Sequence, residues 1–265
     1  MLYISLLAID RIAYFCPFVN PFGQIFAGSE QDFSLTASEK GQIMSKIIID
    51  DGFNSEFVET AFFDGVLEIP RIEAPSKIII PEKVIPFSQR NKSVDFSEFP
   101  VFYEYDTNFG DILRSPELYL EDIKRFPGMI SLDNSLYVDS PLTVQIANVY
   151  RSRAIGYYFQ RNGVYVIPNV RWGDERSYTT DVLPEKVAFL GLPKHSIVSI
   201  GTYGCSQSKE EKYHLRHGLT AMLDELEPEV VLVYGSMPES VFGDLKSRTR
   251  FVNYPDWTSS VKRRA

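Results

Sequence analysis

The stretch SIVSIGTYGCSQSKEEKYHLRHGLTAMLDELEPEVVLVYG, residues 196–235, decides the fold class. It opens with the apolar run 196–201 and closes with the apolar run 230–235. Between these runs, residues 207–226 space their apolar side chains as a helix does. Two apolar strands joined by a helix of this length predict a βαβ crossover, and therefore a parallel pair of strands.

The same alternation continues on both sides of this stretch. Ser115-Pro116 and Ser140-Pro141 are typical helix starts in which Ser caps and Pro takes the first helical position. Asn162-Gly163 supplies a left-handed stop, and a short helix is expected after Pro238. Further apolar runs occupy residues 99–105, 127–132, 164–168 and 250–254. The sequence therefore predicts an α/β fold with a mainly parallel sheet, as a partial or distorted β/α barrel, with a doubly wound open sheet as the alternative.

Residues 1–98 follow a different pattern, rich in Phe, Ile, Gly and Pro. Asp51-Gly52 and Asp64-Gly65 are turn signals. Short apolar runs, typical of strands and hairpins, occupy residues 46–49, 65–69, 77–80 and 83–87. The polar stretch 86–99 is the best candidate for a linker. We therefore expect two domains, a β-rich N-terminal lobe at 1–98 and an α/β domain with repeated βα units at 99–265.

Composition excludes several classes of protein and limits where an anionic ligand could bind. With 265 residues, 44% of them hydrophobic and 23% charged, the chain is neither disordered nor a coiled-coil rod. The net charge of −8 repels nucleic acid and anionic membranes, so a phosphate-bearing ligand needs a local basic patch. Cys16 and Cys205 form no CxxC pair, which favours the cytoplasm. Asp10 and Arg11 interrupt the apolar start, so a buried strand or helix is expected there rather than a membrane span.

Polar and aromatic residues follow every strand that the second half predicts. Both architectures place ligands outside the carboxyl ends of their strands. One such residue alone could satisfy loop backbone, but their coincidence at six strand ends favours a binding site. The residues are Asp106, Asp133, Asn134, Tyr137, Asp139, Asn169, Arg171, Trp172, Asp174, Thr202, Tyr203, Tyr234, Gly235, Ser236, Tyr254 and Asp256.

Arginines concentrate between Tyr150 and Arg176, where five Arg face only Asp174 and Glu175, a local excess of three positive charges. The planar fork of Arg suits phosphate or carboxylate, so we interpret the cluster as a site for an anionic ligand. An alternative for Arg151 and Arg153 is that they pair with acids of neighbouring elements. The residues expected to bind the ligand are Arg151, Arg153, Asn169, Arg171, Trp172, Tyr203, Gly204, Tyr234 and Gly235.

Two of these aromatics, Trp172 and Tyr203, could stack on a base or sugar, and Trp172 could equally be a lid over the core. The loop SIGTYGCS at 199–206 resembles a weak phosphate cradle, but it lacks the Gly-Lys-Ser/Thr ending of a P-loop. Cys205 precedes the helix of residues 207–226, where the helix dipole favours a thiolate, although an incidental Cys is the simpler reading.

Three carboxylates, Asp133, Asp139 and Asp174, are the expected catalytic groups, for acid/base work or for a divalent cation. No spacing marks a metal site, so no metal ligand is assigned and no cofactor is identified. His214 and His217 lie three apart without a zinc signature, and we expect both on a solvated helix face.

Residues 99–236 resemble a family borne by phages, plasmids and bacterial genomes, domain of unknown function 4417. The most similar block runs from Asp133 to Trp172. It includes Leu136, Tyr137 and Asp139, the run Asn148, Tyr150, Arg151 and Arg153, then Phe159-Gln160 and Pro168. Arg171 stands where the family commonly has a small hydroxyl residue, and Phe159 where Trp is more usual. The resemblance implies a mobile-element origin and the cytoplasm of a bacterial host, and it leaves the first 98 residues outside.

Three functions agree with these features. The leading one is a phage or mobile-element protein that binds a nucleotide or single-stranded nucleic acid at the strand ends. The second is a carboxylate-dependent hydrolase, assisted by Mg²⁺ in one version. The third is an interaction protein that binds a host or phage protein through exposed aromatics.

Overall fold

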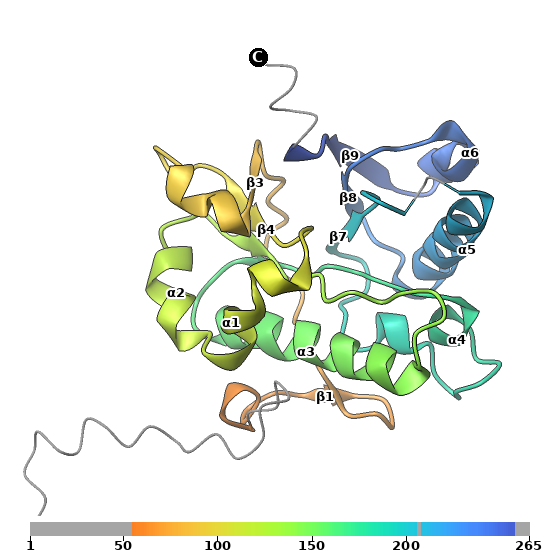
Figure 1. Ribbon diagram of the computed structural model, residues 1–265, viewed down its shortest axis with the longest axis horizontal. Coiled ribbons are helices and arrows are strands. Elements are labelled where there is room, and N and C mark those ends of the chain that lie inside the picture. Colours follow the sequence, from red (N-terminus) through yellow and green to blue (C-terminus); the bar gives the residue numbers. More distant parts are fainter. Residues whose placement is uncertain (1–54, 206–207, 258–265) are drawn as a thin grey trace, which may run out of the picture. The chain divides into compact units, whose positions relative to one another are not determined.

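The computed structural model describes residues 55–205 and 208–257 (Figure 1), which belong to one compact unit. Within these residues, no helix combines the length and apolarity that a membrane crossing requires. The elements in chain order are η2 Ser55–Phe57, β1 Phe63–Asp64, β2 Ile69–Pro70, β3 Val84–Pro86, η3 Phe87–Lys92, β4 Phe99–Val101, η4 Asp106–Asn108, α1 Gly110–Arg114, α2 Glu117–Ile123, β5 Met129–Ile130, α3 Leu142–Arg161, β6 Val166–Ile167, α4 Glu175–Tyr178, η5 Val187–Phe189, β7 Ile197–Gly201, α5 Lys209–Leu226, β8 Val230–Tyr234, α6 Glu239–Phe242, η6 Asp244–Ser247 and β9 Arg250–Tyr254.

The largest sheet is parallel and has the order β7-β8-β9. Its strands keep one register, so that Gly201 pairs with Tyr234 and Tyr234 with Tyr254 at their carboxyl ends. The helix α5 connects β7 to β8, as the stretch 196–235 predicts. The α/β class with parallel strands is confirmed.

The remaining parallel strands are shorter than their apolar runs. β5 pairs with β6, β3 pairs with β4, and a parallel bridge between Asn169 and Ser199 joins the chain after β6 to β7. These pairings form no closed barrel among the described residues, so the partial barrel stays a prediction. Side chains from β4 to β9 nevertheless meet in one core cluster of Phe99, Val101, Tyr103, Ile130, Ile167, Ile197, Val230, Leu232, Tyr234 and Tyr254.

Helices cover the other faces of the strands. Val198 and Val231 point away from that cluster and pack with Leu219 and Met222 of α5. On β5, Met129 joins a separate cluster with side chains of α1, α2 and α3. In Figure 1, α5 and α6 lie beside β7–β9. Because apolar side chains leave both faces of the strands, the strands need no polar alternation.

The helix ends differ in detail from the prediction. Ser115 and Ser140 make no capping hydrogen bond, because α2 and α3 begin one residue later and Pro116 and Pro141 take the N-cap position. The stop after α3 is confirmed, since Gly163 has a φ of +87°. α5 begins with a capping box in which Ser208 and Glu211 each accept a backbone N–H of the other.

The described part of the first 98 residues contains one antiparallel hairpin, β1 with β2. The turn signal Asp64-Gly65 is confirmed, because Gly65 follows β1 with a φ of +66°. The linker expected at 86–99 is wrong: η3 begins there, Phe87 is buried, and Arg90 binds Asp122 of α2 at 2.7 Å. The run 46–49, Asp51-Gly52, Asp10, Arg11 and Cys16 lie outside the described residues. The division at residue 98 stays a prediction.

Candidate functional site

The candidate site is the mouth, defined here as the carboxyl ends of β4 to β8 with Tyr103, Asp133, Asn169, Arg171, Tyr203 and Tyr234. The rings of Tyr103 and Tyr234 stack at 4.9 Å and 18°. Gly201 permits this stacking, because a Cβ there would lie 2.5 Å from the Tyr103 ring. The ends of β4, β7 and β8 are thus held together at the floor of the mouth.

A buried chain of hydrogen bonds crosses this floor. The Tyr103 hydroxyl donates to Asn169 Oδ1 at 3.0 Å and lies 2.6 Å from Ser199 Oγ. Asn169 Nδ2 donates to Asp133 Oδ1 at 2.8 Å, and the Asn169 backbone N–H donates to Ser131 Oγ at 2.8 Å. Every side chain in this hydrogen-bond network is buried, so the network fixes the orientation of the Asp133 carboxylate.

Arg171, which lies in the chain just after β6, adds a charged group to this network. Its Nη1 lies 3.6 Å from Asp133 Oδ2 and 3.4 Å from the Gly201 carbonyl. Its Nε is buried without a hydrogen-bond partner. Cys205, which is half-buried, donates its thiol to the Tyr203 carbonyl at 3.7 Å and contributes to the rise in the pKa of Arg171. Arg171 is therefore a cation with incomplete hydrogen bonding.

Burial sets the protonation behaviour of the mouth. It raises the pKa of Asp133, and the opposing effects of Arg171 and Asn169 are smaller. The carboxylate of Asp133 in turn raises the pKa of Arg171, so the guanidinium stays charged. Burial also raises the pKa of Tyr103 well above its ordinary value, and that of Tyr234 to about 12. Both tyrosines are therefore neutral near neutral pH; the Tyr103 hydroxyl donates to Asn169, and the Tyr234 hydroxyl accepts the Trp257 backbone N–H at 2.9 Å.

Arg151 and Arg153, two of the three arginines of α3, have their own partners. Arg153 is 2% exposed, and its guanidinium donates to the carbonyls of Leu190, Asn169 and Ala188 at 2.9 to 3.1 Å. Because these carbonyls occupy its donors, Arg153 holds backbone segments together and does not contact a ligand in the mouth. Arg151 is half-buried and donates to Asn148 Oδ1 at 2.9 Å.

Trp172 is a lid over the core, as the alternative for this residue held. It is 9% exposed, and its Nε1 donates to the His214 carbonyl of α5 at 3.0 Å. Gly218 on α5 provides the space, because a Cβ there would lie 2.2 Å from Trp172 Nε1. With so little of its surface exposed, Trp172 offers less ring area for stacking than an exposed aromatic does. Tyr203, by contrast, is 56% exposed.

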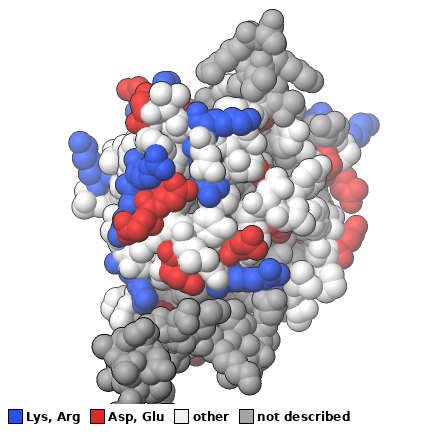
Figure 2. Space-filling model, turned by 60° about the vertical axis from the view of Figure 1, so that its left-hand side comes forward, with Lys and Arg blue, Asp and Glu red and all other residues white. Residues whose placement is uncertain are grey.

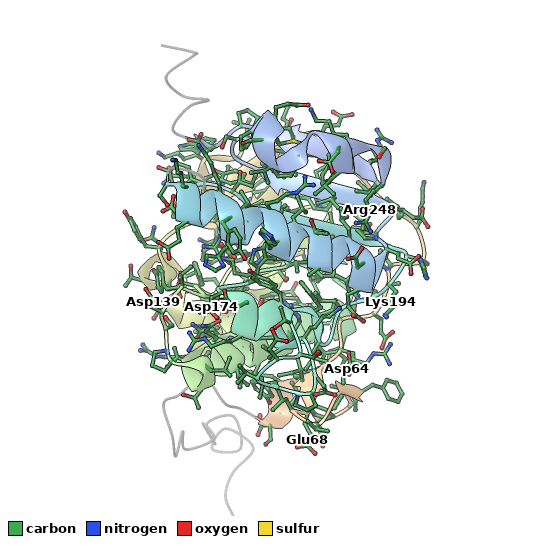
Figure 3. The ribbon with its side chains drawn as sticks, turned by 90° about the vertical axis from the view of Figure 1, so that its right-hand side faces the viewer. Asp64, Glu68, Asp139, Asp174, Lys194 and Arg248 are labelled. Atoms are coloured by element: carbon green, nitrogen blue, oxygen red, sulfur yellow. The ribbon has the colours of Figure 1, made fainter. Side chains whose placement is uncertain are left out.

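The three expected catalytic carboxylates lie in two places. Asp133 belongs to the mouth, whereas Asp174 caps α4 and binds Arg176 Nε and Nη2 at 2.8 and 2.6 Å. Asp139 and Asp174 lie close together near α4 and α5 in Figure 3. There they line an open groove of about 340 Å³ with Val138, Glu175, Arg176, Glu210 and His214. The described residues contain no group of three His, Cys, Asp or Glu side chains fit to hold a metal ion.

One of the two helix histidines differs from its prediction. His217 is exposed, but His214 is 9% exposed, with Nδ1 3.1 Å from the Tyr178 hydroxyl, so its expected place on a solvated face is wrong. Tyr103 and Ser199 were absent from the expected ligand set. The available signal was Ser199 itself, one polar residue within an otherwise apolar strand that the sheet buries.

Comparison with known proteins identifies the family of this chain. The model of the family described as "Domain of unknown function (DUF4417)" matches residues 61–255. The chain belongs to the DUF4417 family. The match starts earlier than the resemblance over 99–236, so the expectation that all of the first 98 residues lie outside the family is wrong for residues 61–98. The match includes every described strand, from β1 to β9.

Relatives of this DUF4417 protein occur in phages. It is 31% identical over 155 residues to the Gene 1 protein of Mycobacterium phage L5, covering 58% of this chain and 65% of the relative. It is 31% identical over 136 residues to the Gene 1 protein of Mycobacterium phage D29, covering 51% and 48%. The chain thus spans about half to two thirds of the length of these curated relatives. No solved structure matches.

The surface charge of the DUF4417 chain is mixed on the face that Figure 2 shows. Lys and Arg side chains alternate there with Asp and Glu, and no large area of one sign appears. This face therefore offers no extended basic patch to an anionic ligand.

Proposed function

We propose that this phage-type protein binds a nucleotide, free or within a single strand, at the mouth, and that Arg171 contacts its phosphate. The observation that carries this proposal is the incomplete hydrogen bonding of Arg171. Its Nε is buried and unpartnered, and its contacts with the Gly201 carbonyl and with Asp133 are long, at 3.4 and 3.6 Å. A buried donor without a partner costs about 1 to 3 kcal/mol, and a phosphate oxygen would remove that cost.

Three of the other four arginines of the cluster support this choice by contrast, because protein groups bind their guanidinium donors. Arg153 donates to three carbonyls, and Arg176 binds both oxygens of Asp174. Arg151 donates to Asn148. A strand end is also where parallel α/β folds bind their ligands, and Arg171 follows β6.

The next strand end offers a surface for the base. Tyr203 follows β7 with an exposed ring, and Gly204 beside it has a φ of +78° with open space where a Cβ would stand. Stacking of a base on an aromatic ring contributes about 1 to 3 kcal/mol. Gly235, with a φ of +115°, packs its backbone on Thr202 and holds the end of β8 close to that of β7.

The test is a fluorescence anisotropy titration with a short fluorescein-labelled oligodeoxythymidine, with unlabelled nucleoside triphosphates as competitors. We expect the affinity to fall as the salt concentration rises. The substitution Arg171→Gln should lower the affinity roughly tenfold. Tyr203→Ala is expected to weaken it by a similar factor without changing the salt dependence, because the stacking partner carries no charge.

The matched control is Arg71→Gln, which removes an exposed Arg beside the hairpin β1–β2 and is expected to leave affinity unchanged. Equal losses in the Arg71 and Arg171 variants would attribute binding to overall charge. Absence of salt-sensitive binding to the oligonucleotide and to every nucleotide tested would refute the proposal.

A second candidate, binding to another protein, rests on the hairpin β1–β2. Phe62, Phe63 and Val66 are 72%, 48% and 73% exposed there, which is unusual for large apolar side chains so close together. The variant Phe62→Ser/Val66→Ser tests it by sedimentation velocity, alone and mixed with lysate of the host. Loss of an association seen with the wild-type chain would support this function, and identical profiles would refute it.

A further inference from the structure

We propose that Asp133 is an internal competitor of the ligand: it occupies Arg171 in the free protein and releases it when the ligand's anionic group enters the mouth. This inference rests on the proposed function and adds how the site is regulated. It assigns Asp133 a role opposite to that of a residue that holds Arg171 in place for the ligand.

The geometry of the ion pair carries the inference. Asp133 uses Oδ2 alone toward Arg171, over 3.6 Å, because Oδ1 accepts from Asn169 Nδ2 at 2.8 Å. The same chain contains a tight carboxylate–guanidinium pair for comparison, in which Arg176 donates to both oxygens of Asp174 at 2.6 and 2.8 Å. The pair in the mouth is therefore a loose one that a better acceptor can replace.

The two partners are held unequally. Asp133 is bound by Asn169, which is fixed in turn by Tyr103 and Ser131. The Arg171 side chain is 19% exposed against 9% for Asp133, and its Nε has no partner. When the pair opens, we expect the guanidinium to move and the carboxylate to stay.

The charge of Asp133 determines in which direction the ligand affinity changes with pH. The groups that face Asp133 are Arg171 from the chain after β6, Asp106 from η4, and the neutral Tyr103 and Asn169. Burial raises the pKa of Asp133, and Asp106 adds to the rise. Protonation of Asp133 removes the competitor, so ligand affinity should increase as pH falls.

The experiment compares Asp133→Asn with the wild-type chain in the anisotropy titration with labelled oligodeoxythymidine. The phosphodiesters of this probe do not titrate between pH 8 and 5. We expect Asp133→Asn to bind roughly tenfold more tightly, because a carboxylate about 4 Å from the guanidinium no longer opposes the phosphate. The double variant Asp133→Asn/Arg171→Gln should bind no better than Arg171→Gln.

The matched control is Asp244→Asn, which makes the same change in net charge at an exposed carboxylate paired with Arg216 of α5. We expect its affinity to equal that of the wild-type chain. If both Asn variants gain equally, overall charge explains the gain and the inference is overturned.

The remaining outcomes separate this inference from the proposed function. Wild-type binding that Asp133→Asn leaves unchanged or weakens overturns the inference and leaves the proposed function standing. No binding by either protein refutes the proposed function and the inference with it. If Asp133→Asn does not fold by circular dichroism, the wild-type chain decides: affinity that stays flat or falls as the pH is lowered to the limit at which the chain stays folded overturns the inference.

Discussion

Arg153 offers the sharpest test of the buried framework below the mouth. The perturbation is Arg153→Met, which keeps most of the side-chain volume and removes the guanidinium. The wild-type guanidinium donates to three backbone carbonyls, those of Leu190, Asn169 and Ala188. It is 2% exposed, and burial lowers its pKa to about 9.

The expected loss follows from those three acceptors. Each buried carbonyl left without a donor costs about 1 to 3 kcal/mol, so three cost at least about 3 kcal/mol. Removing the desolvated charge returns part of this, which makes about 3 kcal/mol the better figure than the upper bound. In a domain of this size that corresponds to a fall in Tm of roughly 6 to 12 °C.

The assay is urea unfolding followed by circular dichroism, with Arg151→Met as the matched control on the same helix. Arg151 is half-buried, and we expect its variant to lose less than about 1 kcal/mol. The folded Arg153 variant should keep its affinity for the oligonucleotide. Equal stability of the two variants, or a selective loss of binding in Arg153→Met, would refute the structural role of Arg153.

Three further predictions concern the same unit. Gly218→Ala should lower the free energy of unfolding, measured in urea, by about 1 to 3 kcal/mol, because its Cβ would lie 2.2 Å from Trp172 Nε1. Adding Trp172→Phe should restore part of this loss. An unchanged stability of Gly218→Ala would contradict the packing. The pKa of Asp174 is lowered to about 2 from 3.8, mainly by Arg176, so its stabilisation of about 2 kcal/mol should hold above pH 4 and disappear as pH falls to 2. Asp174→Asn should therefore be less stable at pH 7 and match the wild-type chain near pH 2, and a constant difference would contradict the assignment. Ser208→Ala should cost about 1 kcal/mol through loss of the capping box, measured by Tm against an exposed Ser247→Ala control.

The element order could be predicted from the sequence because it depends on local signals. Apolar runs over 196–201 and 230–235 became β7 and β8, and Gly163 ended α3 where Asn-Gly predicted a stop. Strand lengths could not be predicted. The apolar runs 127–132 and 164–168 are six and five residues long, but β5 and β6 pair over only two residues each, because the length of a ladder depends on how two distant segments meet. The sequence predicts a linker at 86–99 because the contacts that order η3 within it, those of Phe87 and the Arg90–Asp122 pair, depend on residues distant in the sequence, including α2.

Most of the residues that gather at the candidate site could be predicted from the sequence, but the contacts that each of them makes could not. The rule that ligands bind beyond strand carboxyl ends brought Asp133, Asn169, Arg171 and Tyr234 into one neighbourhood. Composition could not distinguish Arg171 from Arg153, because both lie in one charged cluster and differ in the backbone carbonyls around them.

The most direct test of the central claim is a crystal structure of the chain soaked with a nucleoside triphosphate. We predict density for a phosphate within hydrogen-bonding distance of the Arg171 guanidinium, with Nε engaged and the contact to Asp133 lengthened beyond 3.6 Å. A nucleotide bound elsewhere, with Arg171 still on Asp133 and its Nε still without a partner, would contradict the account.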